Sequence, residues 1–321
     1  MATKTVVLDG HTLNPGDNPW DQLTKLGVTD IFERTATDEV YDRLLNASIA
    51  VVNKVRIGRE LLAKLPDLRF VAVTATGFDC VDVAAARERG IPVSNVPVYG
   101  TNSVAQHVFA TLLHILHRID DHDQAIRTGH WQETGDFSFW LQPLRELCGK
   151  TIGIVGFGRI GRRVGEIANV FGMRVIAHSR RCVDAPDWPG FEWVDLDRLA
   201  LESDVISLHC PLSDDTRGMI GTPFLTRCKS TAILINTGRG PLVVEDDLAA
   251  ALHSKVIHAA ALDVVSQEPI NTDNPLLQAK NCFLTPHMAW ATLEARQRLM
   301  ATTVENVAAF LASKPQNVVN L

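Results

Sequence analysis

The sequence has no long apolar run and few cysteines. No stretch approaches the roughly 18 consecutive apolar residues of a membrane span, and the apolar run in the N-terminal MATKTVVLDG is too short for a signal peptide. The six cysteines are widely scattered without a Cys-x-x-Cys pair, which fits reduced thiols better than disulfides or a zinc site. We therefore expect a cytoplasmic protein without a membrane partner or a metal.

Positive charge is also in deficit. Lysine and arginine number 31 against 37 aspartates and glutamates, so the net charge is −6. A dedicated nucleic-acid binder needs basic surface to neutralise phosphates, and we expect no such partner here. Internal repeats and low-complexity segments are absent. What remains is an ordinary globular composition, 46% hydrophobic and 21% charged, in 321 residues, which is long enough for about two domains.

Short β-branched runs alternate with helical patterns along almost the whole chain, which predicts parallel sheets with crossover helices. A first round of strand patterns occupies residues 5–96, and a second round occupies residues 150–287. Between them, residues 103–126 predict one long helix that bridges two domains. The final helical pattern, residues 291–313, is free to pack back on the first domain. We predict an α/β protein with two doubly wound parallel-sheet domains.

A glycine motif follows the first strand pattern of the second round. It reads Gly156-Phe157-Gly158-Arg159-Ile160-Gly161 and opens a helix. Gly156 allows a tight turn, Gly158 lets the backbone approach a pyrophosphate, and Gly161 lets helix and strand pack closely. The helix N-terminus offers N–H groups to phosphates. The motif predicts a dinucleotide site, and the alternative is a glycine-rich turn that binds nothing.

Polar residues gather where the predicted strands end, which is where open parallel sheets bind their ligands. In the second round these residues are Ser179, Arg180, Arg181, His209, Cys210, Pro211, Thr237, Arg239, Asp263 and His287. In the first round the strand ends hold Asn53, Lys54, Thr76 and Gly77. Glu268 lies in the loop just after Asp263.

Three residues in this set suit the reduction of a 2-keto acid. Arg239 can hold a substrate carboxylate with two parallel hydrogen bonds. His287 can protonate the carbonyl oxygen near neutral pH, and a carboxylate such as Glu268 beside it would fix its tautomer. Taken singly, each fits equally well as a solvated arginine, a helix-capping histidine or a surface-turn glutamate. Together, beside a dinucleotide motif, they predict a catalytic set.

The order of the motifs GFGRIG, HCPL, NTGRG, LDVVSQEP and TPH resembles the D-isomer-specific 2-hydroxyacid dehydrogenase family over nearly the whole chain. The resemblance implies that Arg239 binds the substrate carboxylate and carbonyl, that His287 is the acid/base and that Glu268 pairs with His287. It further implies contacts of Asp263 and Thr237 with the nicotinamide end of the cofactor. We assign His209, Cys210, Pro211 and Thr216 to the cofactor site as well.

The family's architecture implies a division of the chain. Residues 1–102 and 288–321 would form a flavodoxin-like substrate domain, and residues 103–287 a Rossmann-type dinucleotide-binding domain. The helix region 103–119 would form a hinge and an arm around a second subunit, which implies a homodimer.

The resemblance also implies how the substrate is held. Thr76 and Gly77 would offer backbone N–H groups to the substrate carboxylate. Lys54 and Trp290 are further candidate contacts, with a solvated lysine and a core aromatic as alternatives. Within the family, NVPVYGTNSVAQHV and TPHMAWAT are similar to the glycerate dehydrogenase and hydroxypyruvate (glyoxylate) reductase group.

The residues after the strand pattern VIA bear on the cofactor. An NAD-specific enzyme of this fold has Asp or Glu about 20 residues past the glycines, where this chain has Ser179, Arg180 and Arg181. A hydroxyl and guanidinium groups suit a 2′-phosphate, and one charged hydrogen bond of about 1.5–3 kcal/mol would give about 10- to 150-fold preference for NADPH. We expect NADP(H) to be preferred. The alternative is that both arginines are solvated and NAD(H) is also used.

We therefore predict an oxidoreductase that reduces hydroxypyruvate or glyoxylate to the 2-hydroxy acid, of D configuration where the product is chiral. Two other functions fit parts of the pattern. A formate or phosphite dehydrogenase would also use an arginine and a histidine, and a dinucleotide-sensing scaffold would use the fold to bind a protein partner.

Overall fold

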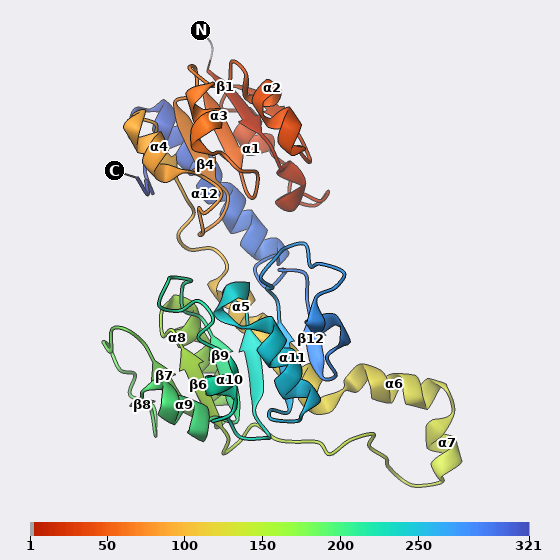
Figure 1. Cartoon of the computed structure of the whole chain (residues 1–321). Helices are drawn as coiled ribbons and strands as arrows, with labels where there is room; N and C mark the ends of the chain where they lie inside the picture. Colours follow the sequence, from red (N-terminus) through yellow and green to blue (C-terminus); the bar gives the residue numbers. More distant parts are fainter. Residues whose placement is uncertain (1–2, 321) are drawn as a thin grey trace. The chain divides into compact units, whose positions relative to one another are not determined.

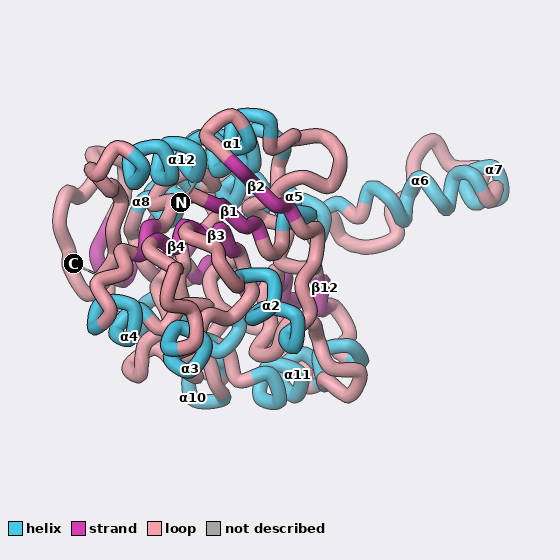
Figure 2. The backbone as a smooth tube through the Cα atoms, turned by 90° about the horizontal axis from the view of Figure 1, so that it is seen from above, coloured by secondary structure: helices cyan, strands magenta, loops and turns pink. Residues whose placement is uncertain are grey.

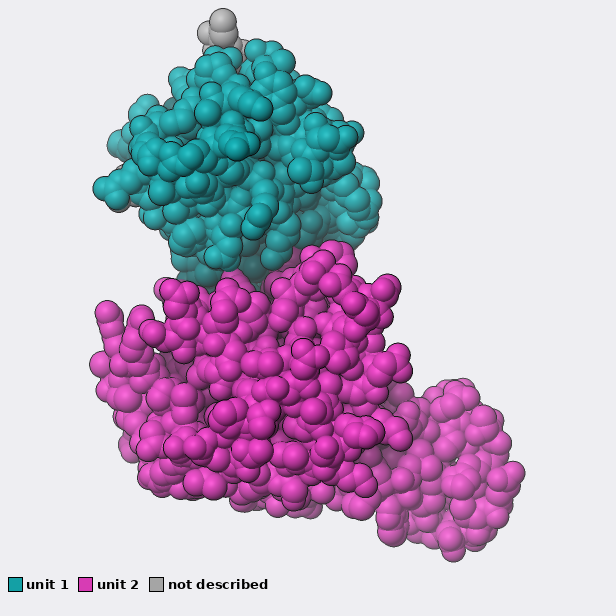
Figure 3. Space-filling model, in the orientation of Figure 1, with its two compact units in different colours: residues 1–100, 291–321 teal, residues 101–290 magenta. Residues whose placement is uncertain are grey.

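The computed structural model describes residues 3–320, which fold into two compact units. Unit 1 comprises residues 1–100 and 291–321, and unit 2 comprises residues 101–290 (Figure 3). The chain leaves unit 1 after Gly100 and returns to it at Ala291, near the domain boundaries predicted after residues 102 and 287. Within residues 3–320 no helix is long and apolar enough to cross a membrane.

Unit 1 is built on a parallel five-stranded sheet with the strand order β2-β1-β3-β4-β5. The strands are β1 (Lys4–Val7), β2 (Val28–Ile31), β3 (Ile49–Val52), β4 (Phe70–Val73) and β5 (Val93–Ser94). Every residue of β3 and β4 is buried, as expected for central parallel strands that are covered on both faces. The order is that of a flavodoxin-like fold, which confirms the prediction.

The last helix of the chain completes unit 1. The helices of this unit are α1 (Asp21–Thr24), α2 (Val40–Leu44), α3 (Arg59–Ala63), α4 (Val83–Glu88) and α12 (Leu293–Leu311), with 3-10 turns at Gly10–Thr12 and Thr37–Glu39. The ring of Phe310 on α12 stacks on Phe70 of β4, with 4.5 Å between the ring centroids. The prediction that the final helix packs back on the first domain is therefore confirmed.

Unit 2 is built on a parallel seven-stranded sheet with the order β12-β11-β10-β9-β6-β7-β8. The strands are β6 (Thr151–Val155), β7 (Arg174–His178), β8 (Glu192–Trp193), β9 (Val205–Leu208), β10 (Ile233–Asn236), β11 (Ala259–Leu262) and β12 (Cys282–Leu284). The order reverses at β6, as in a Rossmann-type dinucleotide-binding fold, and this confirms the predicted fold class. The two-residue strand β8 was not predicted.

Helices cover both faces of this sheet (Figure 1). They are α5 (Thr101–His117), α6 (Ile119–Arg127), α7 (His130–Thr134), α8 (Arg159–Val170), α9 (Leu196–Glu202), α10 (Thr222–Leu225) and α11 (Glu245–His253), with 3-10 turns at Gly240–Leu242 and Pro275–Gln278. One buried cluster joins α5 and α8 to the sheet, and a second joins α9, α10 and α11 to it. The sheet is therefore the middle layer of three.

The helix predicted over residues 103–126 is in fact two helices. The break lies at Arg118, whose φ of 47° is in the left-handed region that disfavours a residue with a side chain. After the break, α6 and α7 extend away from the remainder of unit 2, as the cartoon and the tube view both show (Figures 1 and 2). This segment and its following loop carry exposed apolar side chains, among them Ile119, Phe137 and Trp140.

Replacing Phe310 by alanine should lower the free energy of unfolding by about 2 kcal/mol, because it removes a half-buried ring from the contact of α12 with β4. Urea unfolding followed by circular dichroism measures the change. Lys314→Ala, an exposed position just past α12, is the control and should leave the transition where it is. An F310A midpoint equal to that of K314A would show that the helix contributes little to unit 1.

Candidate active site

Of the three glycines in the turn after β6, Gly158 alone has open space beside its Cα. Gly156 has φ +93°, and a Cβ there would lie 2.4 Å from the backbone nitrogen of Cys210. A Cβ on Gly161 would lie 2.2 Å from the carbonyl oxygen of Gly156. A Cβ on Gly158 would meet nothing within 4 Å, so the chain is open at the glycine expected to face a pyrophosphate.

The other residues of the glycine motif divide between packing and exposure. Phe157 is 7% exposed and packs edge to face on Trp188 and Trp193. Ile160 is half-buried against the same core, whereas Arg159 is exposed at the start of α8. No side chain caps this helix N-terminus. Backbone N–H groups without a side-chain cap can donate hydrogen bonds to phosphate oxygens, so the turn fits a dinucleotide.

The positively charged loop after β7 is open to solvent. Ser179 is half-buried, and Arg180 and Arg181 are exposed. Neither arginine pairs with a carboxylate among the described residues. On α8, Arg162 donates a 2.7 Å hydrogen bond to the carbonyl of Asp184 and so ties the loop to the helix. The guanidinium groups of Arg180 and Arg181 thus remain available to an anion.

The loop after β9 holds two neutral groups and an internally bonded threonine. His209 Nε2 lies 2.8 Å from the Ser207 hydroxyl, and burial lowers its pKa to about 3, so the ring is uncharged at neutral pH. Burial raises the pKa of the Cys210 thiol. The Thr216 hydroxyl donates to the Pro211 carbonyl at 2.8 Å and accepts the N–H of Ser213. Thr216 therefore serves the turn of this loop.

The loop after β10 brings Arg239 beside the loop that carries Glu268. Arg239 is half-buried, and its guanidinium donates a 2.9 Å hydrogen bond to the Gly238 carbonyl. A Cβ on Gly240 would lie 2.0 Å from the carbonyl carbon of Val265, so a glycine is required where the two loops meet. The buried hydroxyl of Thr237 has no hydrogen-bond partner within residues 3–320. A group that must find a partner fits a bound ligand.

Glu268 and His287 are in direct contact. Glu268 Oε2 lies 2.7 Å from His287 Nδ1, although 19 residues separate them in the chain. Both side chains are partly exposed, at 34% and 26%. Because Nδ1 is engaged, Nε2 is the nitrogen that His287 can offer to a substrate. The sequence proposed this pair, and the structure brings it together.

Asp263 holds the segment on which His287 lies. Its side chain is 1% exposed, and it accepts the hydroxyl of Thr285 at 2.6 Å. It also accepts the backbone N–H groups of Met288 and Ala289, both at 2.9 Å. The sequence associated Asp263 with the cofactor. The structure adds a role that the sequence did not indicate, because these three donors tie down both sides of His287.

In unit 1, Asp9 is a residue that the sequence reasoning missed. Its carboxylate, at the end of β1, accepts the N–H groups of Asn53 at 2.8 Å, Lys54 at 2.6 Å and Val55 at 3.2 Å. Burial raises the pKa of the Asp9 carboxyl, and the backbone hydrogen bonds oppose the rise. The one available signal was an acid at the end of the strand pattern TVVLD. Asp9 shapes the loop that presents the exposed Lys54.

The other two predicted residues of unit 1 follow β4. The Thr76 hydroxyl donates to the Val96 carbonyl at 2.8 Å, and Gly77 comes next in the chain. Trp290, the last residue of unit 2, is half-buried. Among the described residues no group of three or more His, Cys, Asp or Glu side chains could hold a metal ion.

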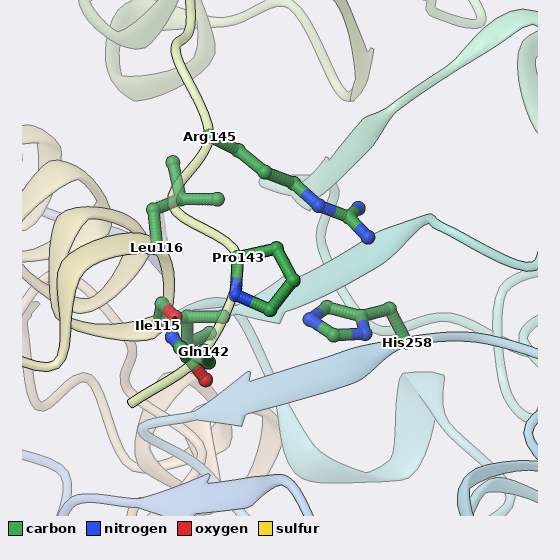
Figure 4. A pocket seen from close by; sticks show the side chains of 6 residues that line it. All are labelled: Ile115, Leu116, Gln142, Pro143, Arg145 and His258. Atoms are coloured by element: carbon green, nitrogen blue, oxygen red, sulfur yellow. Dashed lines mark hydrogen bonds between the residues drawn. The ribbon is translucent and has the colours of Figure 1, made fainter. Parts of the chain in front are cut away.

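A small cavity of about 70 Å³ lies at the opposite edge of the unit 2 sheet. It is lined by Ile115, Leu116, Gln142, Pro143, Arg145 and His258, and the arginine and imidazole side chains extend toward each other in Figure 4. His258 precedes β11, so this cavity is at the amino ends of the strands. Burial and the charges of Arg145 and Arg118 lower the pKa of His258. None of the predicted site residues lines this cavity.

Comparisons with known proteins agree with this geometry. Residues 109–289 match the family model described as "D-isomer specific 2-hydroxyacid dehydrogenase, NAD binding domain". A hydroxypyruvate reductase of Blautia hydrogenotrophica is 48% identical over 320 residues, which is 99% of each chain. A glycerate dehydrogenase of Methylorubrum extorquens is 42% identical over 291 residues, which is 90% of each chain.

The fold has close matches among solved structures as well. An acyclic imino acid reductase in complex with NADPH and D-Arg superimposes with a TM-score of 0.83 at 32% identity. The match covers 98% of this chain and 99% of that one.

Two glycine substitutions should separate folding from cofactor binding. Gly161→Ala places a Cβ against the Gly156 carbonyl, so it should lower the Tm and weaken cofactor binding together. In Gly158→Ala the added methyl group meets open space, so the Tm should stay within about 2 °C of the wild-type value. The Kd for NADPH should rise at least about 10-fold, because the methyl group keeps the phosphates away from the backbone. Thermal unfolding and fluorescence titration measure the two quantities. Unchanged NADPH binding by G158A would place the cofactor elsewhere.

Proposed function

The chain belongs to the D-isomer specific 2-hydroxyacid dehydrogenase family, and from this membership we propose that it reduces hydroxypyruvate to D-glycerate, and glyoxylate to glycolate, with NADPH. The 2.7 Å contact between Glu268 and His287 carries the proposal, because it leaves one ring nitrogen for proton transfer beside the loop of Arg239. The names of the relatives, hydroxypyruvate reductase and glycerate dehydrogenase, support this substrate class.

Each residue of the catalytic set has one task in this proposal. The Arg239 guanidinium binds the substrate carboxylate and orients the keto group. His287 donates the proton on Nε2 to the carbonyl oxygen as the carbon is reduced. Glu268 accepts the hydrogen bond of Nδ1 and stabilises the protonated ring. When bound, the nicotinamide supplies the hydride.

We assign cofactor binding to residues of unit 2, and we assign further contacts with the substrate carboxylate to residues of unit 1. In unit 2 the glycine turn would take the pyrophosphate, and the partnerless hydroxyl of Thr237 would contact the nicotinamide end. Asp263 and the loop from His209 to Pro211 would border the same site. In unit 1, Lys54, Thr76 and Gly77 are proposed to bind the substrate carboxylate, and Trp290 is a further candidate contact.

The NADPH preference is supported by the loop after β7. Arg180 and Arg181 are exposed and carry no carboxylate partner among the described residues, and no acid occupies the strand end to repel a 2′-phosphate. We also propose a homodimer, in which the α6 and α7 segment and the loop after it bury exposed apolar side chains, such as Phe137 and Trp140, against a second copy.

The ratio of kcat/KM for hydroxypyruvate with NADPH to that with NADH tests the cofactor assignment. We expect at least about a 10-fold preference for NADPH in the wild type, which falls in Arg180→Ala or Arg181→Ala and fades at high salt, because exposed charges are screened. Arg163→Ala, an exposed arginine of α8 paired with Glu166, is the matched control. Equal use of both cofactors would show that neither Arg180 nor Arg181 binds the 2′-phosphate. Turnover of formate or phosphite in place of keto acids would favour a dehydrogenase of that class.

Substitutions in the catalytic set should have distinct kinetic effects. His287→Ala should lower kcat by about 100- to 10,000-fold and leave the Kd for NADPH unchanged, because it removes only the proton donor. Arg239→Ala should raise the KM for hydroxypyruvate as well as lower kcat, since the carboxylate is held in both the ground state and the transition state. Steady-state kinetics with fluorescence titration measures both. Wild-type turnover in H287A would rule out this mechanism, and binding of a protein partner without any turnover would favour a sensing scaffold.

A further inference from the structure

One face of α5 is hydrogen-bonded to the chain on both sides of His287. Ser103 and His107 are four residues apart and therefore lie on the same face of the helix. The Ser103 hydroxyl donates a 2.6 Å hydrogen bond to the carbonyl of Ala289. His107 Nε2 lies 3.1 Å from the hydroxyl oxygen of Thr285. The helix thus contacts the positions two residues before and two residues after His287.

The donors and acceptors of this contact can be assigned. The Thr285 hydroxyl donates its one proton to Asp263 at 2.6 Å, so toward His107 its oxygen can only accept. His107 must therefore carry a proton on Nε2 and donate it. The side chain of His107 is 13% exposed, and that of Asp263 is 1% exposed. The result is a partly buried chain of hydrogen bonds from α5, through Thr285, to the carboxylate that holds Met288 and Ala289.

The segment that this chain supports has an unfavourable backbone conformation. His287 has φ +53°, in the left-handed region, where a side chain is disfavoured. Its N–H group donates to the carbonyl of Asp263 at 2.8 Å. Such a conformation persists only where the surroundings hold it in place. Asp263, Thr285 and α5 provide those surroundings.

We propose that His107 is a positioning residue for the reaction: it donates to Thr285, orients the Thr285 hydroxyl toward Asp263, and thereby holds His287 in register with Glu268. The inference rests on the proposed function in one respect, namely that His287 is the proton donor. His107 acts on His287 through Thr285 and Asp263. Its Nε2 lies 3.1 Å from the Thr285 hydroxyl and 3.7 Å from Asp263 Oδ1, and only the first distance is short enough for a hydrogen bond.

Four variants isolate the donor on His107. His107→Phe keeps a ring of similar shape without a donor, whereas His107→Gln places an amide N–H close to the position of Nε2. Thr285→Val removes the hydroxyl through which His107 acts and keeps the side chain's shape. His117→Phe, an exposed position at the end of the same helix, is the matched control.

We expect H107F to lower kcat for hydroxypyruvate at least about 10-fold, because misplacement of a catalytic group slows the reacting step. The KM for hydroxypyruvate and the Kd for NADPH should stay within about twofold of the wild-type values. H107Q should recover kcat to within about threefold of the wild type, and H117F should equal the wild type. T285V should resemble H107F, and the double variant should be no slower than either single one, since both break the same chain.

Hydrogen–deuterium exchange gives a measure that does not depend on turnover. The amides of His287, Met288 and Ala289 all donate to Asp263, so exchange in a peptide covering residues 284–290 should be faster in H107F and T285V but not in H107Q or H117F. Unaltered exchange and a kcat within twofold of the wild type in H107F would overturn the proposal, and so would additive losses in the double variant.

His287→Asn, assayed in parallel, distinguishes the two levels of the argument. If H287N loses turnover while H107F does not, only the role of His107 is wrong. If H287N retains turnover, the proposed function fails and the role of His107 fails with it.

Discussion

The buried carboxylate of Asp263 is the constraint on which the candidate active site of unit 2 depends. A carboxylate removed from water must be matched by hydrogen-bond donors, or its burial is strongly unfavourable. β11 fixes the place of Asp263, since Leu262 is in register with Asn236 on one side and with Leu284 on the other. The donors come from the chain that follows β12, namely Thr285, Met288 and Ala289, and these hydrogen bonds set the course of the segment that carries His287.

Strand register explains why the functional residues gather. The last residues of β10, β11 and β12 are aligned across the sheet. Thr237, Asp263 and Thr285 are the residues that directly follow them. Parallel strands bring all their carboxyl ends to one edge, so these three side chains emerge side by side. The loops that continue from them carry Arg239, Glu268 and His287. A sheet that is buried on both faces thus supplies a rigid base for a site built on loops.

The parts of the site that depend on local geometry could be predicted from the sequence. Gly156 and Gly161 are required by a tight turn and by a close helix–strand contact, and both requirements lie within six residues of chain. That both sheets are parallel followed from the alternation of strands and helices, and their flavodoxin-like and Rossmann-type orders are those that the resemblance to the family implied. The set of strand-end residues also followed, because a parallel sheet has only one edge at which ligands bind.

Contacts between distant segments could not be read in this way. The donors to Asp9 lie 44 to 46 residues away, and nothing in the sequence indicated that this acid would meet them. The hydrogen bonds of Asp263 to the segment around His287 could not be predicted for the same reason. The helix break at Arg118 was missed because no proline or glycine marks it, and the apolar pattern continues across the break. The sequence placed Thr216 at the cofactor site and did not indicate that its hydroxyl is hydrogen-bonded within its own loop.

The most direct test of the account is to identify the product formed from hydroxypyruvate and NADPH by the wild-type protein. The account predicts one molecule of D-glycerate for each NADPH oxidised, measured by chiral chromatography alongside the loss of nicotinamide absorbance. Formation of L-glycerate, or no oxidation of NADPH in the presence of the keto acid, would contradict it.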